Sequence, residues 1–217
     1  MREAVPFDRW CVLTVDPAVA LATGGYHDEG LPQDRLPRLS AIESRGEDVL
    51  ALRDLARARV GVLSHATRGA LETSARYREV FAPSGVEHEM RLVFTIAGNI
   101  WGALVMLRGP DVRDFSVSEA DLAVRSTTGV ATAIRRELLL SEIDDDRARH
   151  EGPGLVLLDA ELRPRETTAA ALRWLSEIDD GIDSARELPV AVISLACRAR
   201  DSRERVWARM RTRTGAG

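Results

Sequence analysis

Few residues in this chain could do chemistry, and His27 and Cys11 are the first to consider. His27 is followed by Asp28 and Glu29, and an imidazole beside two carboxylates could bind a metal ion or act as a base. No further ligand follows at a spacing that would close a metal site, so a polar loop is the favoured interpretation. Cys11 would need a second cysteine nearby to act as a redox catalyst, and Cys197 is far away in the sequence. We therefore expect Cys11 to be a small core residue on a buried strand.

The remaining motifs that could carry chemistry are incomplete. His65, in the sequence Leu-Ser-His-Ala-Thr, resembles a phosphoacceptor histidine, but no glycine-rich ATP-binding box follows it. The chain has no phosphate-binding loop, no nucleophile elbow and no CxxC pair. The aspartates at 144–146 have no second cluster of cation ligands, and the arginine-rich stretch at 198–213 offers only Trp207 for base stacking. The sequence thus predicts no catalytic residue, no metal site and no cofactor, and we expect a protein that is not an enzyme.

The composition is that of an ordinary globular protein. The chain has 217 residues, of which 45% are apolar and 29% charged, and its formal net charge of −4 argues against a dominant nucleic-acid footprint. All 30 basic residues are arginines, which we attribute to the codon bias of a GC-rich genome. The sequence shows neither a signal peptide nor an apolar run of membrane-spanning length, and the cysteines form no disulfide pattern. We therefore expect a cytoplasmic protein that does not bind a membrane.

Apolar periodicity and turn residues predict the elements that precede the middle of the chain. In chain order these are a buried strand at 10–15, a second strand at 20–23 that turns at Gly24-Gly25, a loop at 26–37, two short helices within 36–55 broken near Gly46, and a helix at 68–80.

The clearest pattern in the sequence is a β-hairpin. Apolar and β-branched residues at 90–96 and 100–108 are joined by the short turn Ala-Gly-Asn, which is typical of a hairpin. Gly102, within the second strand, indicates either a bulge or a close approach of another backbone segment.

A long helix and a charged linker are expected after the hairpin. Ser118 suits the N-cap of a helix that runs to Glu142, and Asp121 occupies the capping-box position. The charged segment at 144–153 ends in Gly-Pro and predicts a linker between domains. Beyond it, the predicted elements are a strand at 154–159, a return strand at 162–165, a helix capped by Thr167 or Thr168, a helix at 190–198 that Pro189 begins, and a half-exposed strand at 205–212.

The hairpin and the residues after it resemble a known family. The segment 98–108, Gly-Asn-Ile-Trp-Gly-Ala-Leu-Val-Met-Leu-Arg, followed by Phe115, Ser116 and Glu119, is similar to the last hairpin and final helix of GAF domains. The order of the predicted elements also resembles a GAF domain. This resemblance implies an α/β (α+β) fold, in which residues 1–143 form a GAF-like antiparallel sheet with flanking helices and a pocket between them.

The chain resembles more narrowly the N-terminal part of LuxR-type transcription regulators of actinobacteria. The segment from Trp10 to the Gly-Gly-Tyr-His-Asp sequence at 24–28 matches the opening of their GAF-like domain, and 152–159 matches the start of a PAS-like unit. The Thr-Ala-Ala-Ala stretch at 168–171, before Trp174, lies where a PAS helix follows. The resemblance implies an incomplete PAS-like α/β unit at 154–217 and DNA contact through a helix-turn-helix domain that this chain lacks. We also expect a homodimer, on the basis of the long helix at 118–142.

Two functions stay open at this point. The first is a sensory region that binds a small molecule in the GAF-like pocket and signals through the 118–142 helix. The residues expected to line that pocket are Trp10, Leu13, Phe94, Ile96, Trp101 and Leu104. The two tryptophans could instead simply fill the core. The second function is a dimerisation or protein-interaction module without a ligand, which the long helix and its alanine-rich face favour.

Overall fold

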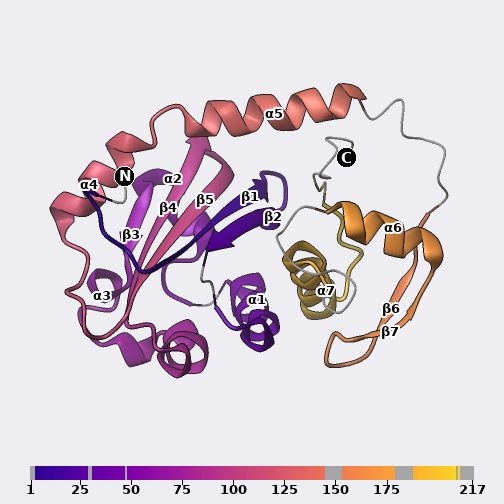
Figure 1. Ribbon diagram of the computed structural model, residues 1–217, viewed down its shortest axis with the longest axis horizontal. Coiled ribbons are helices and arrows are strands. Elements are labelled where there is room, and N and C mark those ends of the chain that lie inside the picture. Colours follow the sequence, from indigo (N-terminus) through magenta and orange to yellow (C-terminus); the bar gives the residue numbers. More distant parts are fainter. Residues whose placement is uncertain are drawn as a thin grey trace.

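A five-stranded antiparallel sheet forms the centre of the computed structural model, which describes residues 3–28, 31–46, 48–144, 153–178, 188–208 and 210 (Figure 1). In spatial order the strands are β2 (Leu21–Asp28), β1 (Arg9–Asp16), β5 (Asn99–Arg108), β4 (His88–Ile96) and β3 (Val60–Val62). Each neighbouring pair is antiparallel. Helices flank the sheet, so the predicted α+β architecture is confirmed.

The β4–β5 hairpin has nearly the bounds that the sequence predicts. Ala97 and Gly98 both have positive φ, 50° and 81°, as in the two-residue turns whose twist matches that of a hairpin. The register shifts opposite Gly102 and leaves Trp101 as the extra residue of a bulge. A Cβ on Gly102 would lie 2.7 Å from the carbonyl oxygen of Leu13. Both reasons expected for a glycine at this position are therefore confirmed.

Strand β2 is longer than predicted. The residues at 24–28, expected in a turn and a loop, form its second half and pair with β1 as far as Trp10. A Cβ on Gly25 would lie 2.6 Å from the carbonyl oxygen of Val12. This glycine therefore serves the close approach of two strands, a role that a sequence pattern does not distinguish from a turn.

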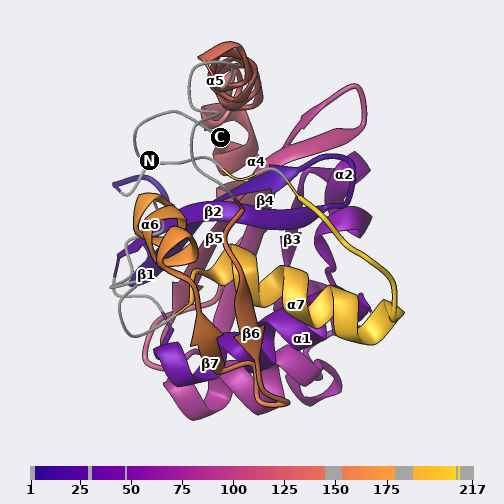
Figure 2. The same ribbon diagram turned by 90° about the vertical axis from the view of Figure 1, so that its right-hand side faces the viewer.

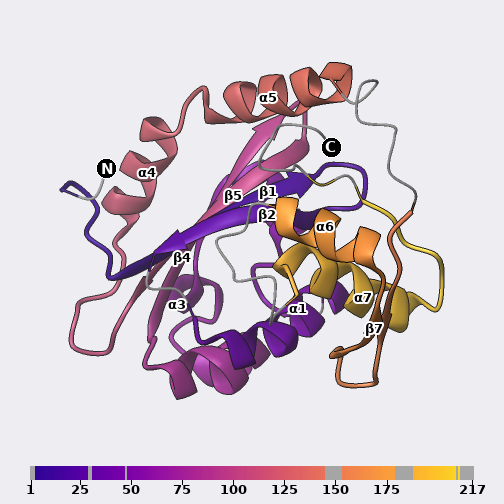
Figure 3. The same ribbon diagram turned by 45° about the vertical axis from the view of Figure 1, so that its right-hand side comes forward.

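One face of the sheet is covered by α4 (Val117–Ser126) and α5 (Val130–Asp144), which Figure 3 shows along the upper side of the strands. The single helix expected at 118–142 is wrong, because Gly129 has a φ of 91° and interrupts it. The hydroxyl of Thr127 donates to the carbonyl of Ala123 at 3.1 Å, which helps to end α4. The buried cluster beneath these helices contains Val5, Val62, Met90, Leu92, Phe94, Leu104, Met106, Phe115, Ala120, Ala123 and Ala131.

The start of α4 is tied to β5 by an ion cluster. Ser116, and not Ser118 as predicted, is the N-cap and forms a capping box with Glu119. Glu119 also accepts from Arg108 of β5 at 2.7 Å and from Arg113 at 2.8 Å. Burial raises the pKa of Glu119, but the hydrogen bonds from Arg108, the Ser116 backbone and Arg113 outweigh it and lower this pKa to about 2.

The opposite face of the sheet is covered by α1 (Leu36–Arg45) and α7 (Val190–Ser202), together with the short helices α2 (Leu55–Ala58) and α3 (Leu63–Ala66). Helix α1 ends at Gly46, whose φ is 61°, so the predicted break at this glycine is confirmed.

The helix predicted at 68–80 forms only in its second half, where residues 75 and 76 are α-helical and Tyr77–Phe81 is a π-helix. Short 3₁₀ turns at Leu71–Thr73 and Ala82–Ser84 flank it, and two more lie at Gln33–Arg35 and Leu52–Asp54. Ser74 is extended between Leu71–Thr73 and the helical part. The carboxylate of Asp48 accepts the backbone N–H groups of Ala75 and Arg76, so a distant side chain starts the helical part.

After the predicted linker, the first elements are a two-stranded sheet of β6 (Val156–Leu158) and β7 (Pro164–Thr167), then α6 (Ala169–Glu177). Thr168 caps α6, as predicted. Pro189 precedes α7, which extends beyond the predicted 190–198. The strand expected at 205–212 is wrong where its residues are described, because 205–208 and 210 are not in a strand. Arg203 ends α7 with a φ of 57°.

The C-terminal segment is not spatially separate from the sheet. Figure 2 shows α7 running beside α1, and it also packs against β2. Ala41 of α1, Leu175 of α6 and Cys197 of α7 belong to one buried cluster. The division into domains at 1–143 and 154–217 stays a prediction, and most of the linker at 144–153 lies outside the described residues. None of the helices described is long and apolar enough to cross a membrane.

Replacing Gly102 with alanine is expected to destabilise the fold by about 1–3 kcal/mol, because its Cβ would overlap the Leu13 carbonyl oxygen in the middle of the sheet. Gly109→Ala is the matched control, since a Cβ there meets no atom closer than 3.6 Å. Its effect should stay within about 0.5 kcal/mol. Urea unfolding measures both, and equal effects would contradict the packing described.

The Glu119 carboxylate is expected to make stability depend on pH. Its pKa in the folded protein, about 2, lies below the ordinary 4.5, so its contribution is present above pH 4.5 and is lost as pH falls toward 2. Glu119→Gln should cost about 2 kcal/mol at pH 6, a figure reduced for solvent screening because Arg113 is 65% exposed. Unfolding at several pH values should show this difference shrinking between pH 4.5 and 2; a difference that does not change with pH contradicts the assignment.

Candidate functional site

A cavity lies between the sheet and the pair of helices α1 and α7. Its volume is about 180 Å³, and its walls come from β1, β2, β4, β5, α1, α7, the segment at 51–53 and Phe81. The lining is mostly apolar, and its larger apolar side chains include Leu13, Leu31, Leu36, Leu39, Phe81, Val105 and Leu107. Its polar lining consists of Ser40, Glu43, Ser44, Arg53, Arg91, Ser194 and Arg198. The cavity can therefore accept a compact apolar group and offers charged groups to a polar end.

The six residues expected to line a pocket do not meet at one place. Leu13 lines the cavity, whereas Trp10 borders it but packs against the core cluster beneath α4 and α5. The other predicted residues that belong to a core cluster, Phe94, Ile96 and Leu104, lie on the opposite face of the sheet, beneath α4 and α5. Successive side chains of a strand point to opposite faces, so a set drawn from both faces cannot converge on one pocket.

Trp101 is held on the α5 side by the bulge of β5. The guanidinium of Arg135 lies 5.7 Å from the centroid of its ring. Trp101 is not part of the cavity lining. Ligand contact by the predicted residues stays a prediction, and among the six the geometry favours it most for Leu13.

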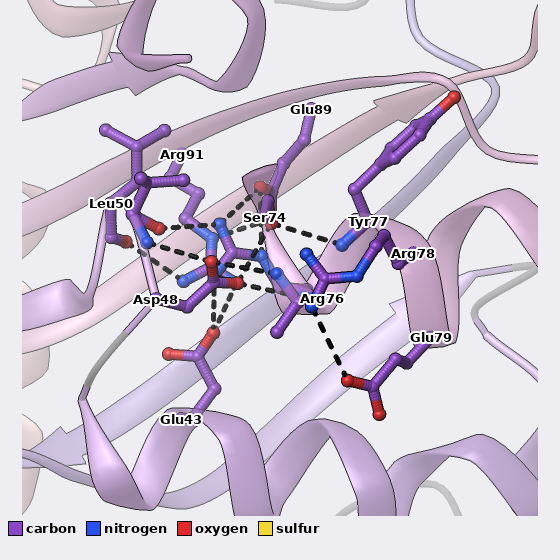
Figure 4. Close-up of polar contacts among 12 residues, drawn as sticks. Glu43, Asp48, Leu50, Ser74, Arg76, Tyr77, Arg78, Glu79, Glu89 and Arg91 are labelled. Atoms are coloured by element: carbon purple, nitrogen blue, oxygen red, sulfur yellow. Dashed lines mark hydrogen bonds and ion pairs between the residues drawn. The ribbon is translucent and has the colours of Figure 1, made fainter. Parts of the chain in front are cut away.

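A buried ion network, which the sequence analysis did not predict, adjoins the cavity (Figure 4). Its centre is Arg76, whose side chain is 0% exposed. The guanidinium of Arg76 binds Glu89 of β4 at 2.9 Å, Glu43 of α1 at 3.0 Å and Asp48 at 3.4 Å. It also donates to the carbonyl oxygen of Val49 at 3.1 Å. Every side of this charged group is thereby satisfied inside the protein.

Arg91 of β4 is the second cation of the network. It binds Glu89 at 2.6 Å and Glu43 at 2.8 Å, and donates to the carbonyl oxygen of Leu50 at 3.2 Å. Burial would lower the pKa of Arg91, but the charges of Glu43 and Glu89 raise it above its ordinary range. Arg91 lines the cavity, so the network and the apolar cavity share a wall.

The carboxylates of the network are also fixed by hydrogen bonds. Asp48 accepts from the hydroxyl of Ser74 at 2.9 Å and from the backbone N–H groups of Ala75 and Arg76. Burial would raise the pKa of Glu43, but the charges of Arg91 and Arg76 outweigh burial and lower it. Glu43 is therefore ionised at neutral pH while it lines an otherwise mostly apolar cavity.

One pattern in the sequence could have indicated the network. Glu89 and Arg91 are two residues apart in a β-strand, so they share a face with Val93 and Thr95, and every residue of β4 from 89 to 94 is buried. Charged residues at such positions are almost never buried unless they are paired. The pattern identifies neither partner, because Glu43 and Arg76 come from distant parts of the chain.

The cysteine and histidine residues that the sequence analysis considered for chemistry do not form a catalytic or metal site in the described part of the structure. Cys11 lines the cavity, and burial is the main cause that raises the pKa of its thiol to about 12. The thiol is thus protonated at neutral pH and poorly suited to act as a nucleophile. His65 is exposed on α3. The side chains of His27, Asp28 and Glu29 lie outside the described part of the chain, and no group of three or more metal-ligating side chains occurs within that part.

Comparison with known proteins gives structural similarity alone. No family model matches the chain, and no curated protein matches it. The GAF domain/HD domain protein from Geobacter sulfurreducens is a similar solved structure, with 18% identity over 64% of this chain and 87% of that chain and a TM-score of 0.44. The cyanobacteriochrome TePixJ GAF domain has 17% identity over 62% of this chain and 82% of that chain, with a TM-score of 0.42. The blue-light absorbing form of the Thermosynechococcus elongatus PixJ GAF domain has 17% identity over 70% and 88%, with a TM-score of 0.38.

Replacing Arg76 with methionine is expected to destabilise the protein by about 3–5 kcal/mol, because it leaves buried carboxylates without their counter-charge. Arg38→Met is the control, since Arg38 pairs with Glu79 on the surface. An exposed pair of this kind contributes less than about 1 kcal/mol. Urea unfolding distinguishes the two variants; a small effect at Arg76 would show that the network is not closed as described.

Proposed function

We propose that this chain is a GAF-like sensory region that binds a small molecule in the cavity between the sheet and helices α1 and α7. The proposal rests on the cavity, because a space of about 180 Å³ with a mostly apolar lining suits a small, mostly apolar molecule. An apolar cavity of about 150 Å³ in another protein is known to stay dry and to bind benzene. The occupant is therefore of about the size of one aromatic ring with a small substituent.

Helix α7 is the wall that a ligand would influence most directly. Its contact with α1 is made by small and polar groups, with 3.5 Å between the hydroxyl oxygens of Ser40 and Ser194 and a hydrogen bond from Arg198 to the carbonyl of Ser44. A ligand that touches both helices would favour one placement of α7 over others. The expected route through 118–142 is less direct, because α4 and α5 pack on the opposite face of the sheet.

The position of α7 would in turn affect the C-terminal segment. Ile193 and Cys197 of α7 share a buried cluster with Leu175 of α6, and Val156 of β6 packs against this cluster. In this proposal the ligand acts through α7 on the PAS-like segment, and through it on the rest of a bacterial transcription regulator. The regulator role, the cytoplasmic location and contact with DNA through a further domain are supported by the sequence resemblance.

The alternative function, a dimerisation module without a ligand, has a separate test. Sedimentation at micromolar concentration measures the state of association directly. A dimer is expected if the module brings two copies together, and a strict monomer contradicts this alternative.

Titration with toluene tests the ligand proposal. The methyl resonances of Leu13, Leu39 and Val105, which line the cavity, should shift in methyl NMR spectra, whereas those of Leu92 and Leu104 on the opposite face should not. Shifts at Leu104 in place of Leu13 would move the pocket to the α4–α5 face, and no shifts at all would contradict the proposal.

A cavity-filling variant provides the matched control for this titration. Ala22 lines the cavity, so Ala22→Leu adds methyl groups to the space and should weaken toluene binding at least about tenfold. Ala66→Leu adds the same groups at an exposed position on α3 and should leave binding unchanged. Equal binding by both variants would show that toluene binds elsewhere.

A further inference from the structure

The carboxylate of Glu43 has one oxygen committed to the ion network and one that is free. Its Oε1 accepts from Arg76 at 3.0 Å and from Arg91 at 2.8 Å. Among the described residues, no hydrogen bond reaches its Oε2, and in Figure 4 all the dashed lines at Glu43 end on the same oxygen. The side chain is 25% exposed and lines the cavity. A cavity occupant can therefore reach an acceptor that the protein itself leaves unused.

The ion network carries an excess of negative charge. Three carboxylates, those of Glu43, Asp48 and Glu89, face two guanidinium groups, those of Arg76 and Arg91, which gives a formal charge of −1. Uncompensated charge is costly in a low-dielectric interior and attracts a counter-charge. A cation placed at Oε2 of Glu43 would balance the network.

The two other cations in the cavity wall are engaged at the end of α1. Arg53 donates to the carbonyl of Gly46 at 2.6 Å and is 58% exposed, with Asp54 at 3.8 Å. Arg198 donates to the carbonyl of Ser44 at 2.6 Å. Cations at a helix C-terminus satisfy its free carbonyl groups and its dipole, so both arginines have a structural role there.

The rest of the lining sets the shape of the ligand. Leu13, Leu39, Phe81, Val105 and Leu107 present an apolar surface, and Cys11 presents a protonated thiol. A second charged group on the ligand would have to be desolvated against these side chains. The lining therefore favours one cationic end on an otherwise apolar body.

We propose that the cavity binds a small, mostly apolar primary amine, whose ammonium group donates to Oε2 of Glu43 while its apolar part fills the space between the sheet and α7. The inference rests on the proposed function and specifies its ligand class. Glu43 is then the residue that determines specificity, since charge-assisted hydrogen bonds are the stronger ones in a buried site.

Four probes of similar shape test the proposal: toluene, benzyl alcohol, benzylamine and benzoate. Calorimetric titration of the whole chain should show benzylamine binding at least about tenfold more tightly than toluene, with benzyl alcohol between them and benzoate weakest. Glu43→Gln should remove the preference for benzylamine. Glu72→Gln removes an equal charge from an exposed position outside the cavity and should retain the preference.

The outcomes separate this inference from the proposed function. Equal affinity for toluene and benzylamine overturns the amine assignment but leaves a ligand-binding cavity, whereas no binding by any probe overturns both. Tighter binding of benzoate would make an arginine the polar contact, and equal affinity for benzyl alcohol and benzylamine would show that charge plays no part.

A measurement on the unaltered protein covers the case in which Glu43→Gln does not fold. Intermolecular NOEs are expected from the methylene protons of bound benzylamine to the Hγ protons of Glu43. Their absence at saturating benzylamine would overturn the proposal.

Discussion

The buried pairing of Arg76 with Glu89, Glu43 and Asp48 is the constraint on which the rest of the structure depends. These contacts join β4, helix α1 and the irregular segment around 71–84, which share no ladder of backbone hydrogen bonds. Loss of one partner would leave an unpaired charge in the interior, which is energetically costly. The elements that carry these side chains can therefore move little relative to one another. Its geometry fixes where α1 lies above the sheet.

The two faces of the sheet differ. The face beneath α4 and α5 is filled by apolar side chains such as Met90, Leu92 and Met106. On the other face Ile42 of α1 packs in an apolar cluster with Val105 and Leu107, the ion network adds charged contacts to α1, and a cavity lies toward α7. Replacing a buried ion pair with apolar groups is often neutral or stabilising, so stability alone does not account for the network. An ionised Glu43 beside an apolar cavity instead suits recognition of a ligand.

The sequence predicted the parts of the fold that depend on local patterns. The hairpin at 90–108, the role of Gly102 and the end of α1 at Gly46 follow from alternation and from the conformational freedom of glycine. The expectation of one helix over 118–142 failed at Gly129, whose positive φ interrupts the helix, a local signal that the apolar spacing alone does not include. The site was harder to predict, because Arg76 lies 33 residues from Glu43 and 13 from Glu89, and nothing in the sequence couples them. Choosing pocket residues from both faces of strands also placed Phe94 and Leu104 away from the cavity.

The central claim is that the ionised carboxylate of Glu43 can accept a hydrogen bond from a ligand in the cavity between the sheet and α7. A crystal structure of the chain grown with benzylamine tests it most directly. We predict density for the amine in the cavity, with its nitrogen within about 3 Å of Oε2 of Glu43 and its ring against Leu13 and Leu39. A structure in which side chains fill this space, or in which the amine binds elsewhere and leaves Glu43 without a new contact, would contradict the account.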